Sequence, residues 1–121
     1  MYKRQEWLER QPAVARVLFP ALPDDPGHAL WQKYFGGGAS LFGLVLHEDS
    51  IEAVARFVDN LQHFQIGSSW GGYESLIAVN RAPLERAVVQ WTESSMLLRL
   101  HIGLEDPEDL IADLEAGLAR L

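Results

Sequence analysis

The segment MLLRLHIGLEDPEDLIADLEAGL, residues 96–118, predicts a β-strand followed directly by an α-helix. Residues 96–102 have the period of two that gives a strand two different faces. Asp106 is a preferred helix N-cap residue, and Pro107 takes the first helical position, where its missing N–H is not needed. The helix then carries an apolar stripe at helical spacing, formed by Leu110, Ile111, Leu114 and Leu118.

The rest of the chain shows the same kinds of signal. Asp49 is the expected N-cap of a helix that runs to about Gln62, with Glu52 as its capping-box partner. One helical turn is expected after Pro83. Strands are expected at residues 14–19, 40–47, 66–73 (bent), 75–79 and 96–102, and helices before Pro12, at 28–35, after Asp49 and after Asp106. This order predicts an α+β fold, a mostly antiparallel sheet with helices packed on one face, in a single domain of residues 1–121.

Composition narrows the classes of function. The 121 residues include 17 acidic and 10 basic side chains, for a net charge of −7. This balance argues against a general nucleic-acid or anionic-membrane surface, because phosphate binding needs clustered Lys and Arg. The chain has no cysteine, which excludes a disulfide scaffold, a thiolate nucleophile and a zinc–thiolate site within it. It also has no apolar run of membrane-spanning length and no hydrophobic signal segment, so we expect a cytoplasmic protein.

The two faces of the strand at residues 96–102 differ in chemistry. One face is apolar and is expected to join the core, with Leu98, Leu100 and Ile102. The other face is mixed, with Leu97, Arg99 and His101. Arg99 can be a solvated side chain on an exposed sheet, or it can bind an anion, since its planar fork matches a carboxylate. The residues alone leave both interpretations open.

The glycine-rich segment at residues 67–71 formally matches the G-x-S-x-G pattern of a serine nucleophile. We reject that interpretation, because the pattern needs a helix directly afterwards, whereas Gly72 follows, and because the chain is too short for the hydrolase fold. These glycines suit a tight turn or a close backbone approach to a ligand. Trp70, in such a loop, is a candidate pocket residue. The four histidines have no metal-ligand spacing, and we expect no metal site.

Two longer motifs carry a resemblance to a known family. They are Ser69-Trp70-Gly71-Gly72-Tyr73-Glu74-Ser75-Leu76 and Leu98-Arg99-Leu100-His101-Ile102-Gly103-Leu104-Glu105-Asp106. Residues 12–18 and 23–28 agree with the same family, in order and at compatible spacing. On these residues the chain resembles, essentially from end to end, the Cys/Met-metabolism enzymes that depend on pyridoxal 5′-phosphate (PLP). The resemblance implies the C-terminal small domain of fold-type-I PLP enzymes.

The resemblance also implies three substrate-binding residues. Arg99 matches the arginine that clamps the substrate α-carboxylate. Ser69 matches a loop serine that helps to position the catalytic lysine and the substrate, and Trp70 matches the aromatic neighbour that shapes the pocket and supports the clamp. Ser68 is smaller than the residue that relatives often have there. Trp70 and Tyr73 resemble the cystathionine β-lyases of bacterial type, whereas γ-lyases and γ-synthases more often have Leu at the position of Trp70.

The implied reaction is an α,β-elimination that converts L-cystathionine to homocysteine, pyruvate and ammonia, with PLP as the electron sink. In such a family the PLP-binding domain and its lysine would lie upstream; the lysines here, Lys3 and Lys33, do not have a setting for imine chemistry. We therefore expect a C-terminal fragment, inactive alone, with no catalytic or cofactor-binding residue of its own. Its expected partners are the missing PLP-binding domain and a small amino-acid substrate. Exposure of Leu97, Arg99 and the segment around Trp70 leads us to expect a homo-oligomer, formed through this face or through the N-terminal helix.

Two other functions stay open at this point. A stand-alone ligand-binding or regulatory α+β module would bind an amino acid without PLP, and an assembly domain would bind no small ligand. The paired motifs favour the PLP-enzyme fragment, because a generic α+β module has no reason to carry them.

Overall fold

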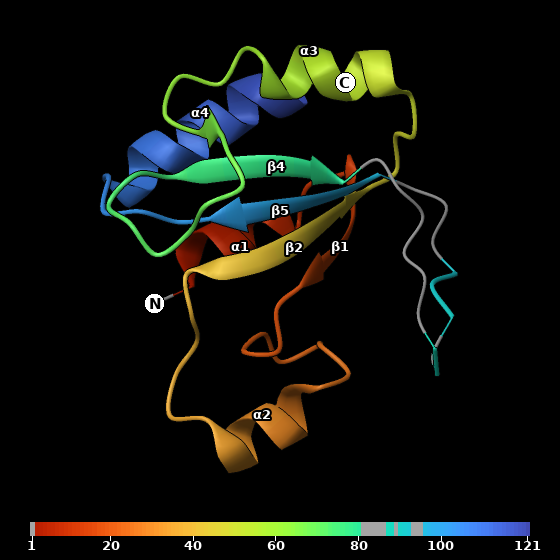
Figure 1. Cartoon of the computed structure of the whole chain (residues 1–121), viewed down its shortest axis with the longest axis vertical. Coiled ribbons are helices and arrows are strands. Elements are labelled where there is room, and N and C mark those ends of the chain that lie inside the picture. The colour runs from red at the N-terminus through yellow and green to blue at the C-terminus, as the bar shows by residue number, and fades with distance from the viewer. Residues whose placement is uncertain (1, 81–86, 89, 93–95) are drawn as a thin grey trace.

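The computed structural model describes residues 2–80, 87, 88, 90–92 and 96–121. The elements of this part of the chain are α1 (Lys3–Leu8), β1 (Val14–Leu18), α2 (His28–Tyr34), β2 (Leu41–Leu46), α3 (Ile51–Val58), β3 (Gln65–Ile66), β4 (Leu76–Asn80), β5 (Leu97–His101) and α4 (Pro107–Leu118) (Figure 1). The longer strands occupy the predicted segments, and the helical turn expected after Pro83 lies outside the described residues. The bent strand expected at residues 66–73 was wrong, because only its first residue is in a strand, β3, and a loop follows. None of the described helices is long and apolar enough to cross a membrane.

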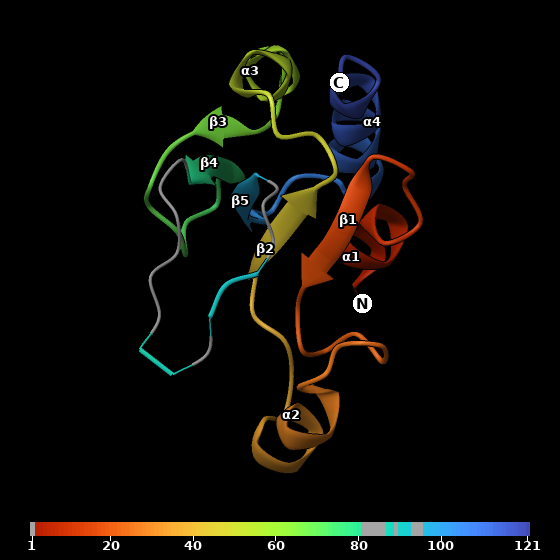
Figure 2. The same cartoon turned by 90° about the vertical axis from the view of Figure 1, so that its right-hand side faces the viewer.

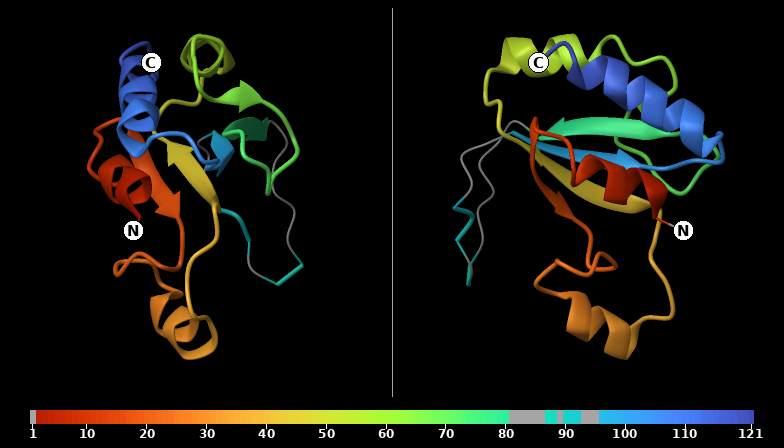
Figure 3. Two further views of the ribbon diagram at one scale, coloured as in Figure 1. Left: turned by 90° about the vertical axis from the view of Figure 1, so that its left-hand side faces the viewer. Right: turned by 180° about the vertical axis from the view of Figure 1, so that it is seen from behind.

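The strands form one mixed sheet in the order β1-β2-β5-β4-β3. Neighbouring strands are antiparallel, except that the two-residue strand β3 pairs with β4 in parallel. Helices α1, α3 and α4 lie on one side of the sheet, whereas α2 projects beyond its end (Figures 2 and 3). The predicted α+β fold, with a mostly antiparallel sheet and helices on one face, is confirmed. Helix α2 stands apart from this layer, and none of its residues is buried.

The core fills the space between the sheet and these three helices. In the strand–helix unit at the C-terminus its fully buried members are Leu98, Leu100, Leu110 and Leu114. Burying one such side chain stabilises the fold by about 1.5–3 kcal/mol. Helices α3 and α4 approach so closely that a Cβ on Gly117 would lie 2.6 Å from Phe57 Cδ2. Ile111 and Leu118, predicted for the same apolar stripe, are only partly buried.

The start of α3 differs from the prediction. Ser50, rather than Asp49, is the N-cap residue. The amide of Ala53 donates to Ser50 Oγ at 3.3 Å, and the Ser50 hydroxyl donates to Glu52 Oε2 at 3.0 Å. Glu48 accounts for the shift, because its Oε1 accepts the N–H groups of Asp49 and Ser50 at 3.0 and 2.8 Å. The predicted Asp49 cap was therefore wrong by one residue, although Glu52 does contribute to the cap.

The end of α3 also differs, because a carboxylate of α4 captures the residues that follow it. The helix ends at Val58 rather than near Gln62. Asp113, which is mostly buried, accepts the amides of Gln62 and His63 at 2.8 Å each, and that of Phe64 at 3.3 Å. Amides bound in this way cannot continue the α3 hydrogen-bond ladder. The sequence feature that could have indicated this capture is Asp113 itself, an acidic residue on the apolar side of the last helix.

Candidate functional site

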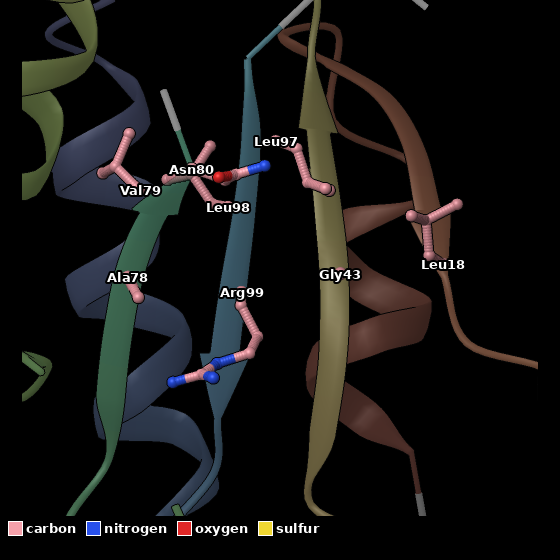
Figure 4. Close-up of a pocket in the computed structure, with 8 residues that line it drawn as sticks. All are labelled: Leu18, Gly43, Ala78, Val79, Asn80, Leu97, Leu98 and Arg99. Carbon is pink, nitrogen blue, oxygen red and sulfur yellow. The ribbon is translucent and has the colours of Figure 1, made fainter. Parts of the chain in front are cut away.

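The sheet face opposite the helices carries Arg99, the predicted anion-binding residue. Its direct neighbours in the two ladders are Gly43 of β2 and Ala78 of β4. Because both neighbours are small, the Arg99 side chain has room to lie across the sheet, in front of β5 and with its guanidinium toward β4 (Figure 4). A cavity of about 450 Å³ opens here. Its lining consists of Leu18, Gly43, Ala78, Val79, Asn80, Leu97, Leu98 and Arg99.

The Arg99 guanidinium is held by the backbone of one loop. This loop comprises residues 67–75, between β3 and β4, and is called the 67–75 loop below. Nη2 of Arg99 donates to the carbonyl oxygen of Ser68 and, at 3.5 Å, to that of Ser69. Nε of Arg99 is buried and has no hydrogen-bond partner among the described residues. Arg99 therefore combines a fixed orientation with an unused donor, and arginine matches carboxylates through such donors.

His101 lies on the same face of β5 as Arg99 but is only 2% exposed. The 67–75 loop covers it: Gly72 O lies 3.1 Å from Nε2, and the Gly71 amide nitrogen lies 3.2 Å from the same atom. On its other side, Ser40 Oγ lies 3.0 Å from Nδ1. The alternation of β5 placed His101 on the correct face, but its enclosure by distant residues was not visible in the sequence.

The two sequence motifs are joined to each other through Ser75 and Glu105. The Ser75 amide and hydroxyl each donate to the Glu105 carboxylate at 2.7 Å, and the Gly103 amide donates to Ser75 Oγ at 2.9 Å. Burial raises the pKa of the Glu105 carboxyl, but hydrogen bonds from Ser75, together with smaller contributions from the Glu105 backbone amide and from His63, outweigh burial and lower the pKa below its usual range. A Cβ on Gly103 would come within 2.7 Å of the backbone carbon of Glu74, so the contact requires glycine. The resemblance therefore rests on residues that make contact with one another.

The structure brings the three predicted substrate-binding residues to one end of the sheet in different ways. Ser69 meets Arg99 through its backbone carbonyl. Trp70 is 63% exposed and does not line the cavity beside Arg99. No helix follows Ser69, since the chain enters β4 at Leu76, and this agrees with the rejection of the serine-nucleophile pattern.

This chain does not itself offer a PLP-binding lysine near Arg99. Lys3 belongs to α1, which lies on the helix-covered side of the sheet (Figure 2), and its Nζ forms a solvent-exposed ion pair with Glu108 Oε1 at 3.2 Å. The Nζ atom of Lys33, on α2, lies 5.0 Å from the centroid of the Tyr34 ring. Among the described residues, no three His, Asp or Glu side chains come together as metal ligands. The site fits the carboxylate of a ligand, but the residues present do not fit the cofactor.

Comparisons with known proteins show the family of this chain. The model of the family "Cys/Met metabolism PLP-dependent enzyme" matches residues 2–119. The chain is 48% identical over 123 residues to cystathionine β-lyase MetC of Escherichia coli, covering 98% of this chain and 31% of the relative. It is 45% identical over 118 residues to an L-alanine/L-glutamate racemase of Wolbachia pipientis, covering 96% of this chain and 29% of the relative.

A solved structure shows the same fold at similar coverage. Cystathionine γ-synthase from Xanthomonas oryzae pv. oryzae, in complex with aminoacrylate and cysteine, superposes with a TM-score of 0.80 at 38% identity. The match covers 95% of this chain and 31% of that one. The chain thus spans about a third of the length of the relatives that it matches. On its sequence and its fold, this chain belongs to the Cys/Met metabolism family of PLP-dependent enzymes.

Proposed function

We propose that residues 1–121 form the C-terminal, substrate-carboxylate-binding domain of a PLP-dependent cystathionine β-lyase. The observation that carries the proposal is the buried, unpartnered Nε of Arg99, beside an open cavity. A buried donor without a partner costs about 1–3 kcal/mol, and a small movement of the side chain that let a ligand carboxylate reach Nε would remove that cost.

In this proposal Arg99 holds the α-carboxylate of the substrate. The carbonyls of Ser68 and Ser69 keep the guanidinium from rotating, so that little ordering is needed when the ligand binds. Ser69 and Trp70 then border the substrate from the 67–75 loop. The proposed overall reaction takes L-cystathionine and water to homocysteine, pyruvate and ammonia. PLP supplies the electron sink and would be held by residues outside this chain.

The choice of a β-lyase follows from the relatives. Four further relatives between 41% and 47% identical are named cystathionine β-lyase or putative cystathionine β-lyase. The racemase and the γ-synthase share the domain but differ in reaction. The names of these enzymes refer to α-amino acids, so an arginine that binds an α-carboxylate suits the whole family, whereas the reaction depends on the cofactor-binding part.

We further propose that the open face of the sheet packs against a PLP-binding domain. Leu97 and Leu18 line the apolar part of the cavity on this face and are only partly buried. Exposed apolar surface of this kind is usually covered in the working protein. The isolated chain is proposed to cover it by self-association, and light scattering that finds monomers alone at high concentration would count against this.

A chimera tests the function. This chain would replace the corresponding C-terminal segment of E. coli MetC, which is 48% identical to it. We expect the chimera to bind PLP and to release pyruvate from L-cystathionine. Arg99→Ala in the chimera should lower kcat/KM by about 30-fold or more, since loss of one partner of a buried charge pair costs about 2–5 kcal/mol.

The matched control is Arg120→Ala, which removes an exposed arginine at the far end of α4 and should leave kcat/KM within about twofold. Equal losses in both variants would contradict a carboxylate site at Arg99. A chimera that binds PLP but releases no pyruvate would contradict the β-lyase assignment. Calorimetric binding of an amino acid to the chain alone, without PLP, would instead favour a stand-alone ligand-binding module.

A further inference from the structure

His101 is a buried histidine for which the proposed chemistry has no direct use. It follows Arg99 by two residues in β5, so that both side chains rise from the same face of the sheet. Ser40 Oγ lies 3.0 Å from its Nδ1, and Gly72 O lies 3.1 Å from its Nε2. The imidazole therefore connects the chain just before β2 with the tip of the 67–75 loop.

The contacts with Gly71 and Gly72 together indicate which nitrogen of the ring is protonated. The Gly71 amide nitrogen lies 3.2 Å from Nε2 and 3.4 Å from Nδ1. A position in the ring plane at nearly equal distance from both nitrogens would overlap Cε1, so the amide must lie over the ring face, as an N–H···π contact. The carbonyl of Gly72 can only accept, which requires a proton on Nε2. Nδ1 is then free to accept from the Ser40 hydroxyl.

The tip of the 67–75 loop, residues 68–72, is therefore held at both ends by two residues on the same face of β5. Arg99 holds the carbonyls of Ser68 and Ser69, and His101 holds Gly71 and Gly72. The turn itself depends on Gly71, whose φ of +84° lies in the left-handed region. The side chains of the loop tip are exposed, so few packing contacts fix its position.

We propose that His101, as the Nε2–H tautomer, is a positioning residue that clips Gly71 and Gly72 to β5 and thereby fixes the Arg99 guanidinium for a carboxylate ligand. The role of the clip in ligand binding rests on the proposed function, whereas the clip itself is a property of this chain. His101 acts through Arg99 and does not touch the ligand.

Two substitutions of His101 separate its contact with the 67–75 loop from its contact with Ser40. His101→Gln places an amide nitrogen near the position of Nε2 and keeps a donor for Gly72 O. His101→Asn places its amide near the position of Nδ1, keeps a partner for Ser40 and loses the donor to the loop. The pair is matched in chemistry, so a difference between the two variants reports on the loop contact.

The measurement is NMR of the 15N-labelled chain. Ring 15N shifts of the unsubstituted chain should show His101 protonated at Nε2. His101→Asn should raise the opening of the loop tip, read as amide exchange of Gly71, by about tenfold, as expected for the loss of one hydrogen bond. The heteronuclear NOE of the Arg99 Nε–H should fall in the same variant. His101→Gln should keep both values near those of the unsubstituted chain.

Three results would overturn the clip: an Nδ1–H tautomer, a loop tip and Arg99 unchanged in His101→Asn, or equal losses in His101→Gln and His101→Asn. The ring shifts decide the tautomer even where a variant does not fold. The chimera then separates the clip from the function. There His101→Asn should raise KM by about tenfold with a smaller change in kcat. If the loop responds as expected in the chain but KM does not change, the link to carboxylate binding is wrong and the clip stands.

Discussion

The alternate residues of β5 have different roles on the two faces of the strand, core packing on one and hydrogen bonding on the other. On the helix side, Leu98 and Leu100 are fully buried among other apolar side chains, and packing alone holds them. On the open side, Arg99 and His101 are held by hydrogen bonds to the 67–75 loop. Packing energy accumulates over many contacts, whereas each hydrogen bond is one directional contact. Stability and ligand geometry can therefore be changed almost independently at adjacent positions.

The largest effect on stability is expected from the helix side. Leu100→Ala should lower the free energy of unfolding by about 2–5 kcal/mol, because it leaves a cavity in the closed core. Leu97→Ala, on the open face, should lower it by about 1 kcal/mol or less, since Leu97 is only partly buried. Urea unfolding of both variants gives the comparison. Equal losses would mean that the open face is packed as tightly as the core.

A smaller effect is expected where the two motifs meet. Ser75→Ala removes the hydroxyl that bonds Glu105 Oε2 and the Gly103 amide, at a cost of about 1–3 kcal/mol. The Ser75 backbone amide still donates to Glu105 Oε1 in this variant. Ser69→Ala removes an exposed hydroxyl and should change the free energy of unfolding by less than about 0.5 kcal/mol. If thermal or urea unfolding ranks the two serines the other way, the motif contact is not a stabilising element.

The glycines of the loop tip give the next comparison. Gly71→Ala forces a side chain into the left-handed region and should cost about 1–2 kcal/mol. Gly72→Ala should cost less, because its φ is not positive and an added Cβ would meet no atom within 4 Å. An added Cβ should therefore lower the free energy of unfolding more at position 71 than at position 72, and urea unfolding measures both values. Similar costs for both would show that the turn does not depend on the conformation of Gly71.

The smallest effect is a dependence on pH. The pKa of Glu105 is lower in the folded chain than in the unfolded one. Its contribution to stability is therefore present above the unfolded pKa and is lost as the pH falls through the folded pKa. The stability difference between the unsubstituted chain and Glu105→Gln should shrink as the pH is lowered from about 6 to about 3. A difference that stays constant over this range would contradict the role of the Ser75 hydrogen bonds.

The fold could be predicted largely from the sequence because its signals are local. The two-residue period of β5 and the Asp106 cap depend on neighbours in the chain, and Asp106 does accept the Glu108 amide at 2.8 Å. The errors arose where a distant side chain intervened. Asp113 captures amides about 50 residues away, and Glu48 displaces the cap from Asp49 to Ser50.

Less of the candidate site than of the fold could be predicted from the sequence. Alternation along β5 placed Arg99 on the open face, and the resemblance supplied its proposed role. The enclosure of His101 by Ser40 and by the 67–75 loop could not be predicted, because these contacts join residues 61 and about 30 positions apart. The sequence also did not show that Ser69 meets Arg99 through its backbone rather than its hydroxyl.

The central claim is that the open face of β5 binds a carboxylate through Arg99. The most direct test is a cycle in the MetC chimera that combines Arg99→Ala with a substrate analogue, in which an amide replaces the carboxylate at the cysteinyl end of L-cystathionine. We expect Arg99→Ala to lower kcat/KM for L-cystathionine by about 30-fold or more, but for the amide by no more than about threefold. Equal losses for the two substrates would contradict it, because Arg99 would then support the enzyme without binding the carboxylate.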